Sequence, residues 1–297
     1  NACITALARC GRWRQALAVL DGMRQIAPIA SADDGLGGER LICESVRPDV
    51  VSYSSAITAC GKAGQRRRAL ALLCDMRVEG IPPNVVSYNA AIHACVQATD
   101  FPTNSAETDL DRARAGEVVS GSSAGQGWPL VLGLMSDMRS EGLAPDVFTY
   151  STAITACGKA GQWERALMLL DEMEMGQEKL APDVISVNAA IAACGRAGEC
   201  DRALELLRRM TSGAATRLSA GGESLTGDEG RYRDTGNGSE NSWPRPDAWS
   251  FNIAMEACAK AGRWRDGVSL LPLMRRAGIR PDIHSYAAAF ACLRAGG

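Results

Sequence analysis

Aromatic side chains are scarce in this 297-residue sequence, at 5% of all residues, and histidine occurs only at His93 and His284. Because most of the apolar residues are aliphatic, the core must pack closely, as it does between helices, and an all-β sandwich is excluded. No run of about 18 apolar residues is present, which excludes a membrane-spanning helix. Two histidines supply neither a histidine-rich metal site nor a Ser/His/Asp triad. We therefore expect a helical, non-enzymatic protein that needs no metal and no cofactor.

The sequence also lacks a Cys-x-x-Cys pair, although it contains 11 cysteines. Helices that pack side by side lie about 8 to 10 Å apart, whereas a disulfide needs Cα atoms within about 7 Å. Buried free cysteine commonly acts as a small hydrophobic residue. We expect this role for the cysteines that occupy one slot of successive repeats, namely Cys60, Cys95, Cys157, Cys194 and Cys258.

An internal repeat accounts for most of the sequence. The tetrad Pro-Asp-Val-Val, or a close variant, recurs and is followed by Ser or Thr, usually an aromatic residue, and then usually Asn or Ser. The spacing of the Asp or Asn is 35 residues in the shortest intervals. The copies begin at Pro48-Asp49, Pro83-Asn84, Pro145-Asp146, Pro182-Asp183, Pro246-Asp247 and Pro281-Asp282. The pattern is cut at both ends of the sequence, so we expect the chain to be a fragment.

Three stretches rich in Gly, Ser and acidic residues interrupt this array, and we expect them to be disordered insertions at about 28–47, 98–125 and 211–246. The formal net charge is −2, and outside the insertions Lys and Arg slightly outnumber Asp and Glu. That balance permits a polyanionic partner without requiring one. We expect one repeat array over 1–297, with repeats at about 1–49 (truncated), 50–84, 85–146, 147–183, 184–247, 248–282 and 283–297 (truncated).

Each unit reads as a helical hairpin. The Ser or Thr that follows the tetrad, such as Ser52 or Thr149, is suited to be the N-cap of the first helix. The second helix carries an apolar stripe that ends in a Met, such as Met76 or Met173, and glycine follows it. Pro272 lies inside a second helix, where we expect a kink or a short helix. One hairpin cannot bury its apolar face alone, so we expect an all-α solenoid of stacked hairpins.

These patterns resemble the pentatricopeptide repeat family. The resemblance is carried by Val85-Val86-Ser87-Tyr88-Asn89 and by the run from Gly158-Lys159-Ala160-Gly161 through Ala166-Leu167 to Met173. It covers the whole chain outside the insertions and has the 35-residue, P-type-like period. The nearest rival, the tetratricopeptide family, has a W-x-x-L-G-x-x-Y pattern that is absent here.

The resemblance implies binding of single-stranded RNA, with one base read by each repeat. The readers are a polar residue near the start of the first helix and the last residue of the same unit. The implied pairs are Asn1 with Asp49, Ser54 with Asn84, Asn89 with Asp146, Ser151 with Asp183, Asn188 with Asp247, and Asn252 with Asp282. Family preference then implies the track U-A-U-G-U-U, read from 5′ to 3′. Each Asp also suits a helix start for structural reasons alone, since an anion there is favourable.

The residue two positions after each Asp or Asn is implied to lie against the plane of a base. These residues are Val51, Val86, Phe148, Ile185, Trp249 and His284. Phe148 and Trp249 are the side chains that stack most strongly on bases. The alternative is that this position only covers the junction between hairpins.

The resemblance favours a non-enzymatic RNA adaptor in organellar RNA processing, stability or translation, in a chloroplast or mitochondrion, with other RNA-processing proteins as further partners. A protein-binding α-solenoid scaffold is a second hypothesis, which the near-neutral charge favours. A third is the RNA-binding part of a larger enzyme that resembles protein-only ribonuclease P. The sequence contains no cluster of Asp residues for such a nuclease.

Overall fold

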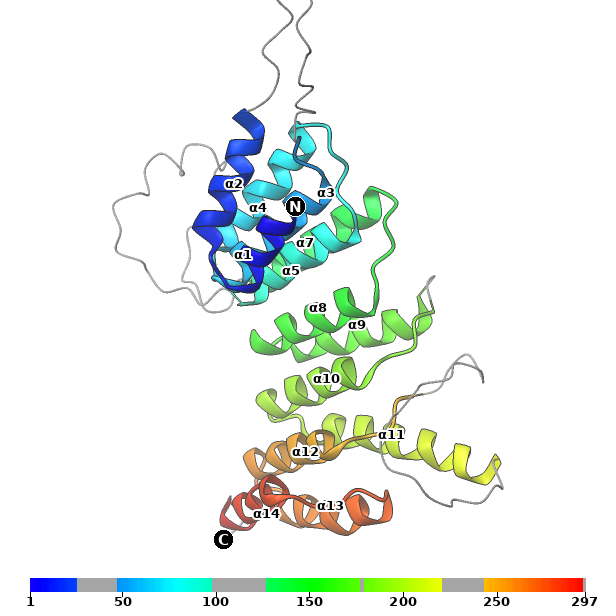
Figure 1. Cartoon of the computed structure of the whole chain (residues 1–297). Helices are drawn as coiled ribbons and strands as arrows, with labels where there is room; N and C mark the ends of the chain where they lie inside the picture. Colours follow the sequence, from blue (N-terminus) through cyan, green and yellow to red (C-terminus); the bar gives the residue numbers. More distant parts are fainter. Residues whose placement is uncertain (26–46, 98–126, 177–178, 221–242, 296–297) are drawn as a thin grey trace, which may run out of the picture. The chain divides into compact units, whose positions relative to one another are not determined.

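The computed structural model describes residues 1–25, 47–97, 127–176, 179–220 and 243–295. Within these residues every regular element is an α-helix, which confirms the all-α fold class (Figure 1). The chain divides into two compact units, unit 1 (Asn1–Pro145) and unit 2 (Asp146–Gly297). The single array over 1–297 stays a prediction.

The helices occur as successive hairpins. Unit 1 holds α1 (Ala2–Arg9), α2 (Trp13–Gln25), α3 (Val50–Lys62), α4 (Arg66–Val78), α5 (Val85–Gln97) and α7 (Gly127–Ser140). Unit 2 holds α8 (Val147–Lys159), α9 (Trp163–Met175), α10 (Val184–Ala197), α11 (Cys200–Ala220), α12 (Ala248–Lys260), α13 (Trp264–Arg276) and α14 (Ile283–Ala295).

Two layers arise within each unit from the way the hairpins stack. The first helices pack on one another, in the order α1, α3, α5 in unit 1 and α8, α10, α12, α14 in unit 2. Each second helix packs against the first helix of its own hairpin, and most also pack against that of the next. The Met stripe of the second helices lies in this core, since Met76, Met138 and Met210 are fully buried. Stacking therefore buries the apolar faces as the repeat predicts.

The first helices begin one turn earlier than expected. Asp49, Asp146, Asp183 and Asp247 are the N-caps, and each accepts a hydrogen bond from the backbone N–H three residues on. The hydroxyl of the Ser or Thr at that position in turn accepts a hydrogen bond from the backbone N–H of the Asp. In α12, for example, Ser250 Oγ accepts from Asp247 N at 3.1 Å. The prediction that Ser or Thr is the N-cap is therefore wrong, because in this reciprocal capping box the hydroxyl sits at the third helical position.

Glycines permit a close approach where successive first helices end. Gly195 of α10 faces Ala257 of α12, and a Cβ at Gly195 would lie 2.8 Å from Ala257 Cβ and 3.3 Å from its Cα. Carbon atoms do not pack at that separation, so only glycine fits here without a shift. The same contact recurs between Gly158 and Ala193, and less tightly between Gly61 and Ala94.

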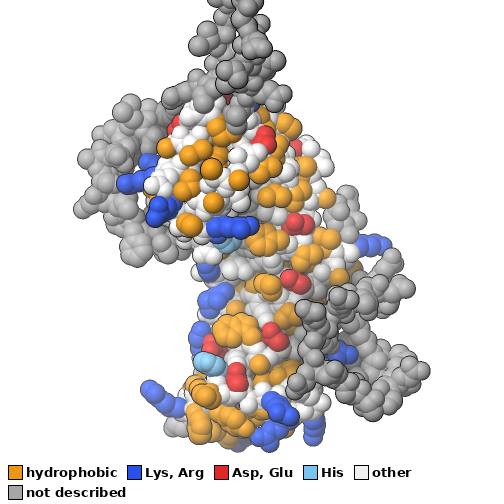
Figure 2. All heavy atoms as spheres, in the orientation of Figure 1, with side chains coloured by type: hydrophobic (Ala, Val, Ile, Leu, Met, Phe, Trp, Pro, Cys, Tyr) orange, Lys and Arg blue, Asp and Glu red, His pale blue; other side chains and the backbone are white. Residues whose placement is uncertain are grey.

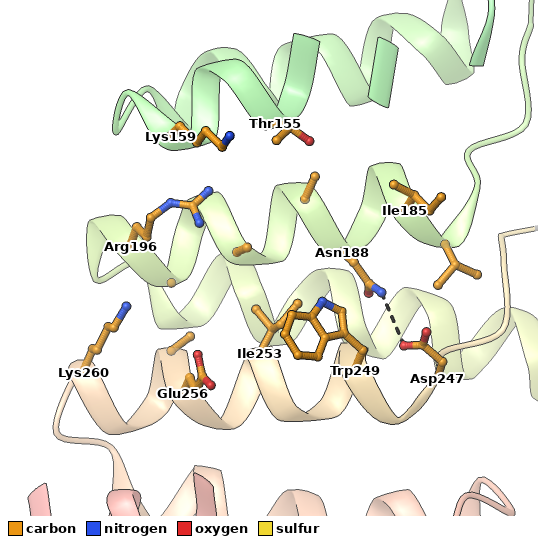
Figure 3. Close-up of a pocket in the computed structure, with 15 residues that line it drawn as sticks. Thr155, Lys159, Ile185, Asn188, Arg196, Asp247, Trp249, Ile253, Glu256 and Lys260 are labelled. Atoms are coloured by element: carbon orange, nitrogen blue, oxygen red, sulfur yellow. Dashed lines mark hydrogen bonds between the residues drawn. The ribbon is translucent and has the colours of Figure 1, made fainter. Parts of the chain in front are cut away.

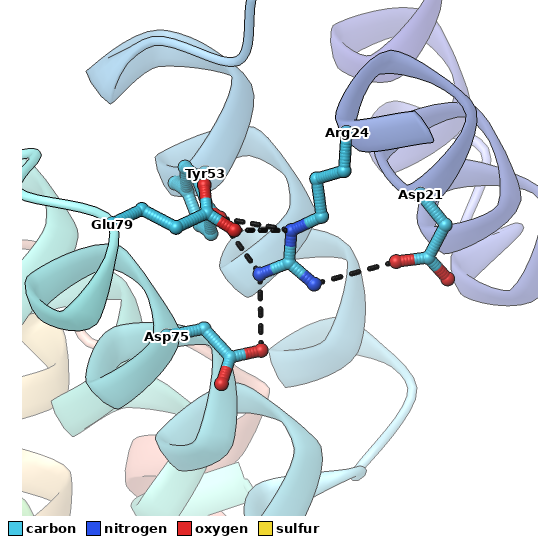
Figure 4. Close-up of polar contacts among 5 residues, drawn as sticks. All are labelled: Asp21, Arg24, Tyr53, Asp75 and Glu79. Carbon is cyan, nitrogen blue, oxygen red and sulfur yellow. Dashed lines mark hydrogen bonds and ion pairs between the residues drawn. The ribbon is translucent and has the colours of Figure 1, made fainter. Parts of the chain in front are cut away.

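Polar networks tie neighbouring hairpins together on the second-helix side. The Arg24 guanidinium of α2 donates to the Tyr53 hydroxyl at 2.7 Å and contacts Asp75 at 3.0 Å and Glu79 at 2.8 Å (Figure 4). Arg77 repeats this arrangement with the Tyr88 hydroxyl and with Glu141. Burial, together with a hydrogen bond to Glu141, raises the pKa of Tyr88 to about 12. The tyrosines therefore stay neutral and link one hairpin to the next.

Two helices differ at least in part from the sequence prediction. Helix α13 contains Pro272 and spans 13 residues, like α9 and α12, so it is not short, and the alternative of a kink stays a prediction. Helix α11 continues to Ala220, so the first residues of the range 211–246, which we expected to be disordered, are helical. Most of that range, and nearly all of 28–47 and 98–125, lies outside the described residues.

The repeated cysteine slot is buried, as the sequence predicts. Cys60, Cys157, Cys194 and Cys258 are fully inaccessible and Cys95 nearly so. The ten cysteines in the described residues are free thiols, although the sulfur atoms of Cys200 and Cys258 approach to 3.2 Å. In the same part of the chain, His, Cys, Asp and Glu nowhere gather into a group that could hold a metal ion. None of the described helices combines the length and apolar character needed to cross a bilayer.

This burial predicts two classes of thiol. Burial raises the pKa of Cys60, Cys95, Cys157 and Cys194 to about 11, which lowers their thiolate content about a hundredfold. Cys3, Cys10 and Cys74 are exposed. In a brief maleimide pulse of the native protein at neutral pH, mass spectrometry of peptides should find label on the exposed set only. The same pulse in urea should label both sets, and rapid native labelling of Cys157 would contradict this packing.

Candidate nucleic-acid interface

Exposed apolar side chains recur at the second position of the first helices. This position lies two residues after the capping Asp or Asn, and the side chains there are 50 to 66% exposed. They are Val51 and Val86 in unit 1, and Phe148, Ile185 and Trp249 in unit 2. These are the residues that the sequence proposes for stacking on bases. His284 of α14 holds the same position.

Apart from Asn1, which precedes α1, the polar residues proposed as readers lie three positions further on, and therefore on the same helix face. Their side chains are mostly covered. Asn188 is 7% exposed, Asn252 4%, Ser54 7% and Ser151 6%. Asn89 is half-buried and Asn1 exposed. Four of the readers, Ser54, Ser151, Asn188 and Asn252, are thus covered, whereas the apolar side chain three positions before each of them is exposed.

Three of the proposed pairs are joined by a direct hydrogen bond. The amide Nδ2 of Asn1 donates to Asp49 at 2.8 Å, that of Asn188 to Asp247 at 3.3 Å, and that of Asn252 to Asp282 at 3.4 Å. These are the Asn–Asp pairs in which both residues lie in the same compact unit, unit 1 or unit 2. In each of them the Asp of one hairpin therefore sets the direction of the Asn amide on the hairpin before it.

The pKa values of two capping carboxylates, Asp49 and Asp282, are lowered, so these two groups stay ionised. Hydrogen bonds from the Ser285 backbone and hydroxyl lower the pKa of Asp282, and Asn252 adds to the effect. For Asp49, burial raises the pKa, but hydrogen bonds from Ser52 and Asn1 outweigh it, so the net shift is downward. An ionised carboxylate accepts but does not donate. It therefore holds the NH₂ group of the Asn and turns the carbonyl oxygen of the Asn away.

That carbonyl oxygen is left without a partner in two repeats. Asn188 Oδ1 and Asn252 Oδ1 are buried and accept no hydrogen bond from any described residue. Buried polar atoms are normally satisfied. A buried acceptor without a partner thus occurs at the same place in consecutive repeats.

Two of the other pairs are not joined directly. Ser54 reaches Asn84 only through Ser87, by contacts of 2.8 and 3.0 Å. The Ser151 hydroxyl donates to the Phe148 carbonyl of its own helix at 3.1 Å, and no hydrogen bond joins it to Asp183 among the contacts of the described residues. Asn89 and Asp146 belong to different units.

A groove of about 580 Å³ lies over the first helices of unit 2 (Figure 3). Asn188 and Asp247 point toward each other at one end of it, beside the Trp249 indole. Ile185 flanks the same end. Lys159, Arg196 and Lys260 line the other end, together with Glu256. The groove thus combines polar readers, exposed apolar side chains and positive charge.

The cations were missed by the sequence analysis. Lys62, Lys159, Arg196 and Lys260 are exposed, and each is the thirteenth residue of its first helix. In Figure 2, Lys and Arg side chains follow one another along the left-hand edge of unit 2. Their signal was present in the recurring Gly-Lys-Ala-Gly turn, which the sequence analysis used for the family resemblance and not as a source of positive charge. Arg196 also donates to the Gly158 carbonyl at 2.8 Å, which fixes its position between α10 and α8.

Models of one repeat family match more than half of the chain. The PPR repeat model matches residues 1–26, 185–213 and 249–279, a second PPR repeat model matches 141–174, and a model of the PPR repeat family matches 48–97. The matches fall on the hairpins described above.

Known proteins show the same likeness. The chain is 26% identical over 181 residues to pentatricopeptide repeat-containing protein 10, chloroplastic, of Zea mays, a match that covers 55% of this chain and 20% of that protein. The chain therefore spans about a fifth of the length of this relative. The crystal structure of maize PPR10 superposes with a TM-score of 0.60 and 24% identity, over 97% of this chain and 31% of that one.

Two further solved structures share the fold. PPR10 in complex with an 18-nt psaJ RNA element has a TM-score of 0.51 and 21% identity, over 98% of this chain and 35% of that chain. The PPR domain of Arabidopsis thaliana protein-only RNase P 1 in complex with tRNA has a TM-score of 0.50 and 13% identity, over 80% of this chain and 95% of that domain.

Proposed function

The chain belongs to the pentatricopeptide repeat family, and on that premise we propose that it is a non-enzymatic adaptor that binds single-stranded RNA and reads one base per repeat. The observation that carries the proposal is the oriented Asn188–Asp247 pair beside Trp249. Its repetition at Asn252 and Asp282 supports a periodic role.

The orientation of the Asn amides favours uracil at these repeats. Asp247 holds the amide nitrogen of Asn188, so the carbonyl oxygen is the atom offered to a ligand. The N3–H group of uracil is a donor on the Watson–Crick edge and can supply the missing hydrogen bond. Since that oxygen is covered, the side chains around it must shift before a base can reach it.

The position of the apolar side chains suits the plane of a base. A base that enters between Ile185 of α10 and Trp249 of α12 presents its edge to Asn188 and stacks on the indole. Base–aromatic stacking contributes about 1 to 3 kcal/mol. Lys159, Arg196 and Lys260 at the far end of the groove supply the charge that phosphates require.

Over the whole chain, the proposed track is U-A-U-G-U-U. The location that we propose for this chain follows its maize relative, which is named as chloroplastic. We place this chain in a chloroplast or mitochondrion, in RNA processing, stability or translation.

The second candidate is a protein-binding scaffold, because Val86, Ile185 and Trp249 leave exposed apolar surface that a partner protein could cover. A scaffold needs no alignment between the Asn amides and particular bases. Base specificity therefore discriminates between the two functions.

A change of one reader tests the proposal. Asn188→Ser converts the Asn188–Asp247 pair into the Ser–Asp combination that the family pairs with guanine. Wild type should prefer U-A-U-G-U-U and the variant U-A-U-G-G-U, each by about tenfold in competition binding at fixed salt. Thermal unfolding should confirm that the variant is folded.

The matched control is Ser269→Ala, on the exposed surface of α13 and away from the groove. It should leave the preference unchanged. If wild type retains both oligonucleotides and a scrambled purine-rich one equally, base reading is refuted.

A further inference from the structure

Among the described residues of unit 1, one edge carries only positive charge, whereas the opposite edge carries both signs. Every charged residue in and beside the turns between α1 and α2 and between α3 and α4 is a cation. We call these residues the turn patch: Arg9, Arg12, Arg14, Lys62, Arg66, Arg67 and Arg68. Residues 9–16 and 61–70 contain no Asp or Glu. The carboxylates in the described part of unit 1 lie at the opposite edge, where first helices begin and second helices end: Asp21, Asp49, Asp75, Glu79, Asp137 and Glu141.

This arrangement opposes helix stability. Arg66 to Arg68 occupy the first turn of α4 and Arg14 that of α2, and neither turn contains an acidic residue. Cations at a helix N-terminus are disfavoured by the helix dipole, and neighbouring cations repel one another. The second helices of unit 2 follow the favourable rule, with Glu164, Asp201 and Asp266 in their first turns. Folding alone therefore does not account for the turn patch.

The patch is built across two hairpins. The guanidinium of Arg68 on α4 lies 4.4 Å from the centre of the Trp13 ring on α2, and that of Arg14 lies 5.2 Å from it. The two arginines thus occupy the ring and leave it poorly suited to stacking on a base. Guanidinium groups match phosphate oxygens by paired hydrogen bonds. The chemistry offered here is phosphate recognition without base reading.

The patch reaches a first helix of its own unit through Lys62. Lys62 ends α3, at the position that Lys159, Arg196 and Lys260 hold in unit 2, and it begins the turn that leads to Arg66. A hollow of about 420 Å³ lined by Lys62, His93 and Gln97 adjoins it. Figure 2 shows Lys and Arg side chains on the left-hand side of unit 1.

We propose that the turn patch binds the phosphate backbone of RNA that extends beyond the bases held over the first helices, without regard to sequence. This inference rests on the proposed function for the position of that RNA. An acidic protein would also complement the positive charge of the turn patch. Because Lys62 belongs both to the patch and to the first helix α3, we favour the RNA strand that lies over the first helices. Since the patch belongs to the first hairpins, it serves the 5′ flank in the proposed orientation.

The test compares RNAs that differ only in their flanks. The probes are U-A-U-G-U-U alone, and the same track with about ten cytidines added at the 5′ or at the 3′ end. The patch variant combines Arg12→Gln, Arg14→Gln and Arg67→Gln, which are exposed. The matched control combines Arg202→Gln, Arg265→Gln and Arg276→Gln in unit 2. Arg265 lies over Trp264 as Arg14 lies over Trp13.

Wild type and the control should bind the 5′-extended RNA about tenfold more tightly than the bare track. The patch variant should lose this gain, and the slope of log affinity against log salt should fall by about 2, with the bare track bound as before. Its melting temperature should stay close to that of wild type, because the loss of the Arg14 contact with Trp13 offsets the removal of unfavourable cations. A purely structural role of these arginines predicts a lower one.

The outcomes separate this inference from the proposed function. If wild type and the patch variant bind the extended RNAs equally, the turn patch proposal is overturned. If the track alone is not bound but extended RNA still binds in a patch-dependent way, the patch stands and base reading fails. Patch dependence at the 3′ extension instead supports the patch and reverses the orientation of the strand.

Discussion

Replacing Gly195 by alanine should lower the free energy of unfolding of unit 2 by about 1 to 3 kcal/mol. The added Cβ would meet Ala257 Cβ at 2.8 Å and its Cα at 3.3 Å, so α10 and α12 must separate. The shift also disturbs the groove, because both residues line it. Urea unfolding followed by circular dichroism measures the change.

Two controls isolate the packing effect. Gly133→Ala in α7 makes the same chemical change where nothing lies within 4 Å of the new atom. It should stabilise unit 1 by about 0.5 to 1 kcal/mol, because alanine is the better helix former. The swap Gly195→Ala with Ala257→Gly restores the space and should recover most of the loss. Equal effects of Gly195→Ala and Gly133→Ala would show that the close approach is not tight.

Replacing Trp249 by alanine should weaken binding of U-A-U-G-U-U by about tenfold to a hundredfold, since one base loses its aromatic stacking partner. The indole is 61% exposed, so its removal should change the melting temperature little. Equilibrium binding with a fluorescently labelled oligonucleotide measures the loss.

Trp264 supplies the matched control. It begins α13, is 36% exposed and stacks with Arg265 at 5.2 Å, and it does not line the groove. Trp264→Ala should therefore leave RNA affinity within about twofold of wild type. If both variants lose affinity to the same extent, the indole of Trp249 is not a stacking platform.

The hairpin fold could be predicted because the repeat presents its signals several times. Glycines such as Gly80 and Gly278 follow the second helices and adopt positive φ, as expected at helix ends. The N-cap could not be assigned, because Asp49-x-x-Ser52 offers two capping residues three positions apart. Only the structure shows that the Asp caps while the Ser closes the reciprocal contact.

The readers were named from the sequence, but their surroundings were not. Sequence spacing places Asn188 on the same face as Ile185, yet its burial depends on how close α12 approaches. That distance is set by contacts such as Gly195 with Ala257, which join residues distant in sequence. For the same reason the direct bond of Asn188 to Asp247 and the missing bond of Ser151 to Asp183 could not be foreseen. Which bases these residues read stays a prediction.

The carboxylates that start the first helices constrain how this surface can diversify. Asp247 anchors the first turn of α12 through Ser250 and at the same time orients Asn188 on the preceding hairpin. Asn84 anchors α5 in the same way through Ser87. A substitution that alters the orienting group must still accept a hydrogen bond from the backbone, which restricts the choice to Asp, Asn, Ser and Thr. The residues that can be introduced at this position are therefore limited to those that can also begin a helix.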